Sequence, residues 1–110
     1  MFTRLFIILV FIAVLTACED TGPSYNTTDC IENKITSFEP ECGEGAFVNE
    51  YQFRGQLLYL FNNGSCCCDI GHYVLSQSCD TLGLLEGFTG NTMILGEDFS
   101  HAVLKRELWP

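Results

Sequence analysis

Cysteine is the residue type in this chain that could take part in the widest range of chemistry. Seven cysteines occur among 110 residues, and Cys66, Cys67 and Cys68 are consecutive. Together with Asp69 and His72 they form a dense set of groups that zinc or copper would accept as ligands. The spacing matches no standard zinc finger, however, and the sequence contains no C-x-x-C motif. Disulfide formation is therefore the favoured chemistry, and we expect no metal and no other cofactor.

Six of the cysteines follow residue 18, and an even number in a small exported domain implies cross-links. Adjacent cysteines rarely bridge each other, because a disulfide needs Cα atoms about 4.4–6.8 Å apart and specific dihedral angles. We therefore expect the triplet to bond outward, with at least one bridge from the N-terminal helix or the acidic turn after it. One or two thiols that stay reduced are the alternative. The disulfide candidates are Cys30, Cys42, Cys66, Cys67, Cys68 and Cys79.

The N-terminal residues are typical of a targeting segment. The run from Leu5 to Leu15 is unbroken and apolar, too short for a helix that needs about 20 residues to cross a bilayer but fitting for a signal peptide. Leu15-Thr16-Ala17-Cys18 resembles the bacterial lipobox, and this resemblance implies cleavage before Cys18 and acylation of that residue. Plain secretion with an ordinary Cys18 is the alternative. Two or more acyl chains anchor a protein stably, so we expect the lipid bilayer to be a partner. We expect the protein to be lipid-anchored in the bacterial cell envelope, at an outer membrane, and to face the periplasm or the surface.

The charge of the chain excludes whole classes of partner. Fourteen acidic residues face five basic ones, which gives a formal net charge of -9. Cleavage before residue 18 removes Arg4 and leaves four basic residues, so the charge becomes 4 - 14 = -10. Nucleic acids and anionic lipid headgroups both need a basic protein surface. We therefore expect no nucleic-acid partner.

The sequence divides into a signal peptide (1–17), a flexible acidic tether (18–29) and a single globular domain (30–110). Alternating and periodic apolar residues predict its elements. A helix capped by Asp29 is followed by a hairpin, by a short third strand, by an ordered glycine-rich loop and by a last strand, which is favoured over a helix. The ranges are 29–38, 46–53 with 56–61, 72–75, 77–96 and 102–109. We expect an α+β fold, in which the N-terminal helix packs on a small, disulfide-stabilised antiparallel sheet of three to four strands.

No catalytic constellation accompanies these elements. His72 and His101 lie near serines, but neither a nucleophile elbow nor a triad signature surrounds them. We therefore expect a protein that is not an enzyme. Loops on a rigid scaffold commonly carry binding function, and the candidate contact residues are Phe88, which stands between two glycines, with Thr89 and Asn91.

A pattern of aromatic, glycine and cysteine positions runs over about residues 28–109. It comprises Cys30-Ile31, the segments 50–55 and 58–61, the cysteine triplet with Asp69, and the glycine-rich segments 87–91 and 96–99. In these positions the chain resembles a family of small uncharacterised bacterial lipoproteins with a lipobox and a Cys/Gly-rich α+β domain. The resemblance implies a domain of unknown function and adds no catalytic residue.

The expected function is that of a membrane-anchored bacterial lipoprotein that acts as a small binding or inhibitor-like module of the cell envelope. Its partner would be an envelope protein or a glycan. The alternative is a small envelope enzyme or metal-binding protein that uses Cys66–Cys68, Asp69 and His72.

Overall fold

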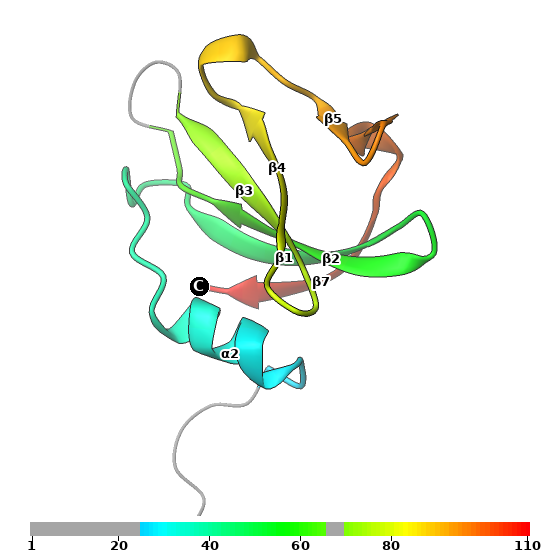
Figure 1. Ribbon diagram of the computed structural model, residues 1–110. Helices are drawn as coiled ribbons and strands as arrows, with labels where there is room; N and C mark the ends of the chain where they lie inside the picture. The colour runs from blue at the N-terminus through cyan, green and yellow to red at the C-terminus, as the bar shows by residue number, and fades with distance from the viewer. Residues whose placement is uncertain (1–24, 66–69) are drawn as a thin grey trace, which may run out of the picture.

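The computed structural model describes residues 25–65 and 70–110. Within these residues the chain is mostly antiparallel sheet with one short helix (Figure 1). Several predicted features lie outside the described residues: the signal peptide, Cys18, most of the tether, the triplet Cys66–Cys68 and Asp69. No helix in the described part is long and apolar enough to cross a bilayer.

A five-stranded sheet in the order β4-β3-β2-β1-β7 is the main element, and β5 pairs with β6 in a separate two-stranded sheet. All the pairings are antiparallel. The elements are α2 (Asp29–Thr36), β1 (Phe47–Phe53), β2 (Gln56–Asn62), β3 (Gly71–Ser76), β4 (Thr81–Glu86), the 3-10 turn η1 (Gly87–Thr89), β5 (Met93–Ile94), β6 (Glu97–Asp98), the 3-10 turn η2 (Phe99–His101) and β7 (Val103–Trp109).

The predicted α+β fold with three to four strands is wrong, because the described residues form seven strands and the architecture is mostly β. The missed strands β4 and β5 lie in the segment 77–96 that was predicted to be a glycine-rich loop, and β6 follows it directly. Gly83 interrupts the apolar pattern of β4, yet its lack of a side chain is what lets β5 approach. A Cβ at that position would lie 2.6 Å from Cδ1 of Ile94.

The β1–β2 hairpin confirms the strongest local signal in the sequence. Its strands pair in register from Phe47↔Asn62 to Phe53↔Gln56. Arg54 and Gly55 link them with φ values of 50° and 79°, and positive φ at both central residues is the two-residue turn whose twist suits a hairpin. The strand expected near the C-terminus is also present, as β7.

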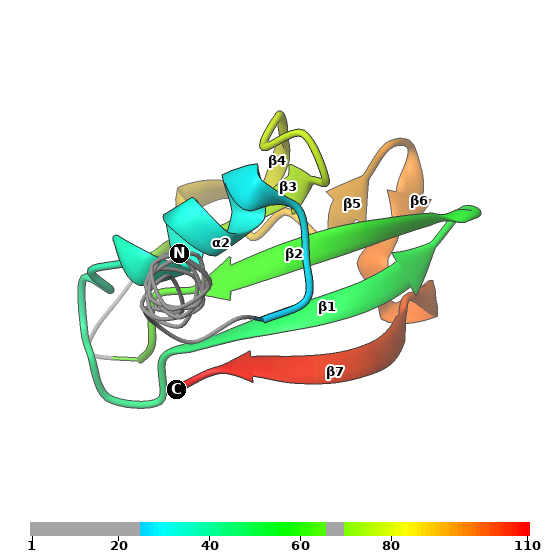
Figure 2. The same cartoon turned by 90° about the horizontal axis from the view of Figure 1, so that it is seen from below.

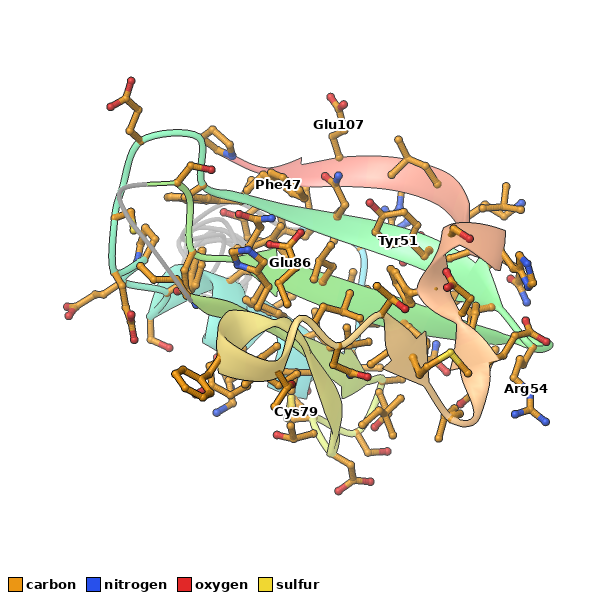
Figure 3. All side chains as sticks on the ribbon, turned by 90° about the horizontal axis from the view of Figure 1, so that it is seen from above. Phe47, Tyr51, Arg54, Cys79, Glu86 and Glu107 are labelled. Carbon is orange, nitrogen blue, oxygen red and sulfur yellow. A yellow bond between two sulfur atoms is a disulfide. The ribbon has the colours of Figure 1, made fainter. Side chains whose placement is uncertain are left out.

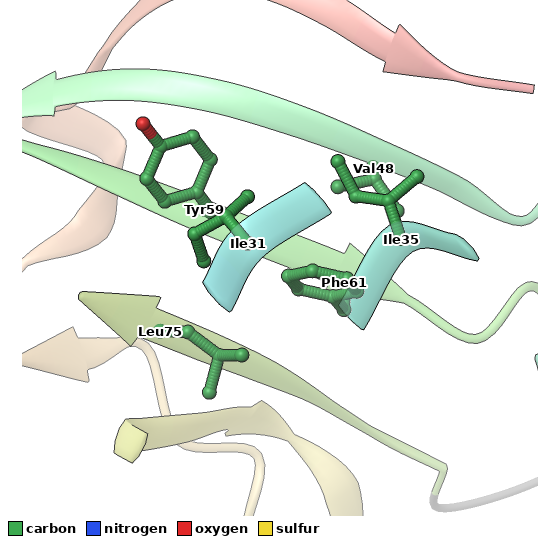
Figure 4. Close-up of a cluster of buried hydrophobic side chains, with 6 residues drawn as sticks. All are labelled: Ile31, Ile35, Val48, Tyr59, Phe61 and Leu75. Carbon is green, nitrogen blue, oxygen red and sulfur yellow. The ribbon is translucent and has the colours of Figure 1, made fainter. Parts of the chain in front are cut away.

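Helix α2 covers one face of the large sheet (Figure 2). Ile31 and Ile35, one helical turn apart, are almost fully buried against β1, β2 and β3 (Figure 4). The predicted cap was off by one residue: Oγ1 of Thr28 accepts the N–H of Ile31 at 3.3 Å, and the helix ends at Thr36. The apolar cluster on this face consists of Ile31, Ile35, Val48, Tyr59, Phe61 and Leu75.

The opposite face of the sheet is only partly covered, by β5, β6 and η2. Ile94 of β5 is buried there, and the ring of Phe99 lies 5.1 Å from that of Tyr51 and 5.3 Å from that of Phe53. The cluster beneath them consists of Phe53, Leu58, Leu60, Val74, Leu85 and Ile94. The remainder of this face is open for a binding site.

One disulfide is not among the expected pairings, in which Cys30 and Cys79 would each bond to a member of the triplet. Cys30 at the start of α2 is bonded to Cys79, which follows β3, so neither of them pairs with the triplet. The helix lies across the sheet with its first turn beside the β3–β4 connection, where Oγ1 of Thr28 donates to the carbonyl of Gln77 at 2.7 Å. Cys42, in the acidic turn after the helix, is disulfide-bonded as well. The expected bridge from the helix or this turn to the triplet involves residues 66–68, which lie outside the described residues, so it stays a prediction.

A charged network joins the two ends of the described chain. Nε and Nη2 of Arg106 on β7 donate to the two carboxylate oxygens of Glu50 at 3.0 and 2.9 Å, and Tyr59 donates its hydroxyl to the same carboxylate at 2.9 Å. Nη1 of Arg106 donates to the carbonyl of Tyr25 at 2.9 Å, so the last residues of the predicted tether are held against the domain. The hydrogen bonds from Arg106 are the main reason why the pKa of Glu50 is lowered.

Candidate binding site

A groove of about 380 Å³ opens on the sheet face opposite the helix, between β1, β4 and the β6–η2 segment. Tyr51, Leu60 and Phe99 give it an apolar floor, whereas Glu86, Asn91, Thr92, Asp98 and Ser100 give it a polar rim. Figure 3 looks onto this face, with Tyr51 on β1 and Glu86 at the end of β4. An apolar floor with few polar groups at its rim is the usual make-up of a ligand site.

His72 forms a hydrogen bond with the Glu86 carboxylate at this rim. His72 is buried, and its Nδ1 accepts the backbone N–H of Asn63 at 3.0 Å. The proton must therefore be on Nε2, which donates to Oε2 of Glu86 at 3.1 Å. The backbone of Glu86 has φ 60° and ψ -123°, a conformation that residues other than glycine rarely adopt.

Asn91 closes the loop that follows β4. Its Nδ2 donates to the carbonyls of Leu84 and Met93, both at 2.9 Å, and its backbone pairs with that of Glu86. The predicted contact residue Asn91 thus holds the loop together and also lines the groove. The loop between Glu86 and Asn91 is a fixed structure, not a loose connection.

Phe88 projects from this closed loop and is 90% exposed. Gly87 and Gly90 on either side of the η1 turn have φ values of 67° and 66°, which only glycine adopts without strain. The predicted contact residues Phe88 and Thr89 are therefore both at the surface. A large apolar ring held in water by a rigid loop is available to a partner.

Asp98 contributes a second carboxylate to the rim. Its Oδ1 accepts the backbone N–H of Ser100 at 2.9 Å, and its Oδ2 accepts the hydroxyl of Thr92 at 3.2 Å. The hydrogen bond from the Ser100 backbone is the largest cause of the lowered pKa of Asp98. Asp98 is therefore negatively charged at neutral pH, which agrees with the acidic composition of the chain.

A second hollow, of about 400 Å³, lies beside β1 and β7 and is lined by Phe47, Asn49, Glu107, Trp109 and Pro110. Asn49 is only 9% exposed, and its Oδ1 has no hydrogen-bond partner among the described residues. The sequence interpretation missed this residue. A signal was present, because Asn49 is the one polar position on a strand face that otherwise carries Phe47, Tyr51 and Phe53.

The residues of the predicted metal-binding alternative are only partly described. Of Cys66, Cys67, Cys68, Asp69 and His72, only His72 lies in the described part, and both of its ring nitrogens are engaged within the protein. Residues 25–65 and 70–110 contain no group of three or more His, Cys, Asp or Glu side chains placed to hold a metal ion.

Comparison with known proteins gives a family but no function. No curated protein and no solved structure matches the chain. One family model matches residues 34–110, a range that includes every strand described above and starts after Cys18. This confirms the predicted domain of unknown function, and the chain belongs to the family described as Domain of unknown function (DUF6970).

Proposed function

We propose that this chain is a lipid-anchored interaction module of the bacterial cell envelope, which is held to a membrane through acylated Cys18 and contacts a protein partner with the loop 87–91. The observation that carries the proposal is the 90% exposure of Phe88 on a loop closed by the Glu86–Asn91 pairing. Aromatic anchors that enter a pocket of the partner supply much of the binding energy of an interface.

The rigidity of the loop supports this role. Association loses free energy when flexible side chains and loops must be ordered, so a loop already fixed in shape binds more tightly for the same contact area. Here the paired backbones of Glu86 and Asn91 and the two hydrogen bonds from Nδ2 of Asn91 fix the loop before any partner arrives. The groove next to it offers further apolar surface at Tyr51 and Phe99.

The lipid anchor is supported by the residues Leu15 to Cys18 and by the apolar run before them. Anchoring would confine the module to the membrane surface on which its partner lies, and such confinement raises the effective concentration of two partners without any new contact.

Intact-mass spectrometry of membrane fractions tests the anchor. The wild-type chain should lack residues 1–17 and carry the added mass of lipid on Cys18. The Cys18→Ser variant should carry no lipid, because the thioether that attaches the acyl groups needs the sulfur. A wild-type chain that is released from membranes with an unmodified Cys18 would contradict the proposal.

Replacement of Phe88 by alanine tests the contact loop. We expect Phe88→Ala to weaken capture of the partner from its own membranes by about thirtyfold or more, since truncation of an aromatic anchor commonly costs about 2 kcal/mol or more. Quantitative affinity capture, with a photo-cross-linking phenylalanine analogue at position 88 to identify the proteins in direct contact, is the measurement.

Val103→Ala is the matched control, because Val103 is 58% exposed but lies on the edge strand β7. It should capture the same proteins as the wild type in the same yield. An equal yield from wild type and Phe88→Ala, with no cross-link from position 88, would contradict the module.

A further inference from the structure

The residues directly before α2 are fixed on the domain by β7 and by the helix itself. The N–H of Tyr25 donates to Oε1 of Glu32 at 3.0 Å, and the carbonyl of Tyr25 accepts Nη1 of Arg106 at 2.9 Å. Nη2 of Arg106 also donates to the carbonyl of Asn26 at 3.4 Å, and the side chain of Tyr25 packs against the apolar cluster beneath the helix. The domain therefore begins at Tyr25, and only the residues before it can serve as a tether.

Two further contacts hold the same segment at its other end. Oγ1 of Thr28 donates to the carbonyl of Gln77 at 2.7 Å, and Cys30 is bonded to Cys79. The segment 25–30 is thus attached both to β7 and to the β3–β4 connection. A pull on the tether is resisted by all of these contacts, so the point at which the tether leaves the domain is fixed.

The tether that remains is shorter than the domain that it would hold. Acylation at Cys18 leaves 25 - 18 = 7 residue steps between the lipid and Tyr25. Seven steps span at most about 25 Å even when they are fully extended. A globular domain of this length is about 30 Å across, so the tether cannot reach from one end of the domain to the other.

The loop 87–91 lies at the end of the domain remote from Tyr25. In Figure 1 the residues before α2 and the helix itself are at the bottom, whereas the gold segment that follows β4 is at the top. The loop leads to β5, whose Ile94 belongs to the cluster on the sheet face opposite α2. If the domain turned over to bring the loop onto the bilayer, Tyr25 would lie about 30 Å above the bilayer, which is beyond the reach of the tether.

We propose that the docking of residues 25–26 on Arg106 sets the orientation of the anchored domain, with α2 on the side of the bilayer and the loop 87–91 about 30 Å above it. The partner therefore meets the loop with a domain that projects from the membrane, and not with a surface that is embedded in the bilayer or level with the headgroups. This inference rests on the proposed function, because it takes the anchor at Cys18 and the contact at Phe88 from it.

Energy transfer to the bilayer surface tests the orientation on the full acylated chain, reconstituted in phosphatidylcholine vesicles that contain a rhodamine-labelled headgroup. A fluorescent amino acid replaces either Phe88 or Asn33, which is exposed on α2. Asn33 lies two residues from both Ile31 and Ile35, so it is on the side of the helix that faces away from the sheet. We expect energy transfer from position 88 to be several times weaker than from position 33. Equal transfer from the two positions would overturn the inference.

A longer tether shows whether its length is the cause. An insert of about 20 glycine and serine residues directly before Tyr25 raises the root-mean-square length of the tether to about 30 Å. The domain can then turn over, so transfer from position 88 should rise toward that from position 33. The same insert after Pro110 is the matched control, because it adds the same mass, leaves the tether as it is and should leave the ratio of the two transfers unchanged. A ratio that does not respond to the insert before Tyr25 would contradict the inference.

Hydrogen exchange at the Tyr25 amide tests the docking itself. This N–H is bonded to Glu32, so its exchange in the wild type should be slower than in an unstructured peptide and should become several times faster in Glu32→Ala. An amide of the wild type that exchanges at the unstructured rate would refute the inference. The tether would then extend to Thr28 and reach about 35 Å, which is enough for the domain to turn over.

The outcomes separate this inference from the proposed function. A cross-link from position 88 to lipid, or to a membrane-embedded segment of the partner, would refute the inference and leave the interaction module standing. No transfer from either position would show that the chain is not held at the bilayer, and the anchor and this inference would fail together. Weak transfer from position 88, with capture that does not depend on Phe88, would refute the contact loop while the orientation of the domain stands.

Discussion

Replacement of both Cys30 and Cys79 by serine is expected to lower the free energy of unfolding by about 4 kcal/mol. The two residues are 49 positions apart in sequence, and a cross-link that closes a loop of about 50 residues removes that much chain entropy from the unfolded state in the loop-closure treatment. The bond also ties α2 to the β3–β4 connection, so its loss should loosen the helix from the sheet. Chemical denaturation, followed by far-UV circular dichroism, measures the change.

A matched control isolates the cross-link from the other contacts of the same helix end. Thr28→Ala removes the cap of α2 and the hydrogen bond to Gln77, yet it keeps the disulfide, and should lower the free energy of unfolding by about 1 kcal/mol. If the double serine variant loses no more than Thr28→Ala, the disulfide does not contribute as a cross-link.

The second large effect is expected at the ion pair between β1 and β7. Arg106→Met should lower the free energy of unfolding by about 3 kcal/mol, because it leaves the carboxylate of Glu50 without its cation while that side chain is only 6% exposed. Arg106 is itself 39% exposed, which places the effect at the lower end for a broken buried pair. Lys105→Met removes a neighbouring exposed charge and should change the free energy of unfolding by less than about 0.5 kcal/mol.

A double variant shows whether the loss arises from the unpaired charge. Glu50→Met together with Arg106→Met removes both charges, and its free energy of unfolding should recover toward the wild-type value, since a buried ion pair can often be replaced by apolar residues at little cost. A double variant that is less stable than Arg106→Met alone would contradict this interpretation.

The pH dependence of stability gives an independent check with a definite sign. In the wild type the hydrogen bonds from Arg106 lower the pKa of Glu50. The contribution of that group is therefore present above the ordinary pKa of a glutamate and is lost as the pH falls through the lowered value. In Arg106→Met, burial without the cation should raise the pKa of Glu50, so acidification from neutral pH should stabilise the variant while it destabilises the wild type.

The stability that Tyr59 contributes to the same network is lost at alkaline pH. Burial and the hydrogen bond to Glu50 raise the pKa of Tyr59 to about 12. Because this folded value lies above the ordinary tyrosine value of 10.0, the stabilising contribution is present below that value and is lost as the pH rises from 10 toward 12.

Local patterns predicted the elements that depend on neighbouring residues. The alternation over 47–53 and the Arg54-Gly55 link were sufficient for the β1–β2 hairpin, and the exposure of Phe88 followed from the glycines beside it. β4 and the β5–β6 pair could not be predicted in this way. Gly83 breaks the apolar pattern of β4, and only the structure shows that a side chain at this position would clash with Ile94.

The candidate site residues likewise differ in whether neighbouring residues were enough to predict them. Phe88 was identified from its neighbours. Asn49 was missed although it is the one polar position on its strand face, because the sequence does not show that its Oδ1 would be buried without a partner among the described residues. Participation of Cys30 and Cys79 in a disulfide was predicted correctly, but their pairing with each other was not.

The sequence by itself determined the acidic character of the surface, the hairpin, the exposed aromatic loop and the presence of disulfides, because each of these depends on composition or on residues a few positions apart. Only the tertiary structure decided that Cys30 meets Cys79, that Glu50 meets Arg106 56 residues later, and that Asn49 lies in an open hollow. Those contacts depend on the order of the strands in the sheet and on where α2 crosses it. Strand order is selected by the packing free energy of the whole domain and has no local signature in the chain.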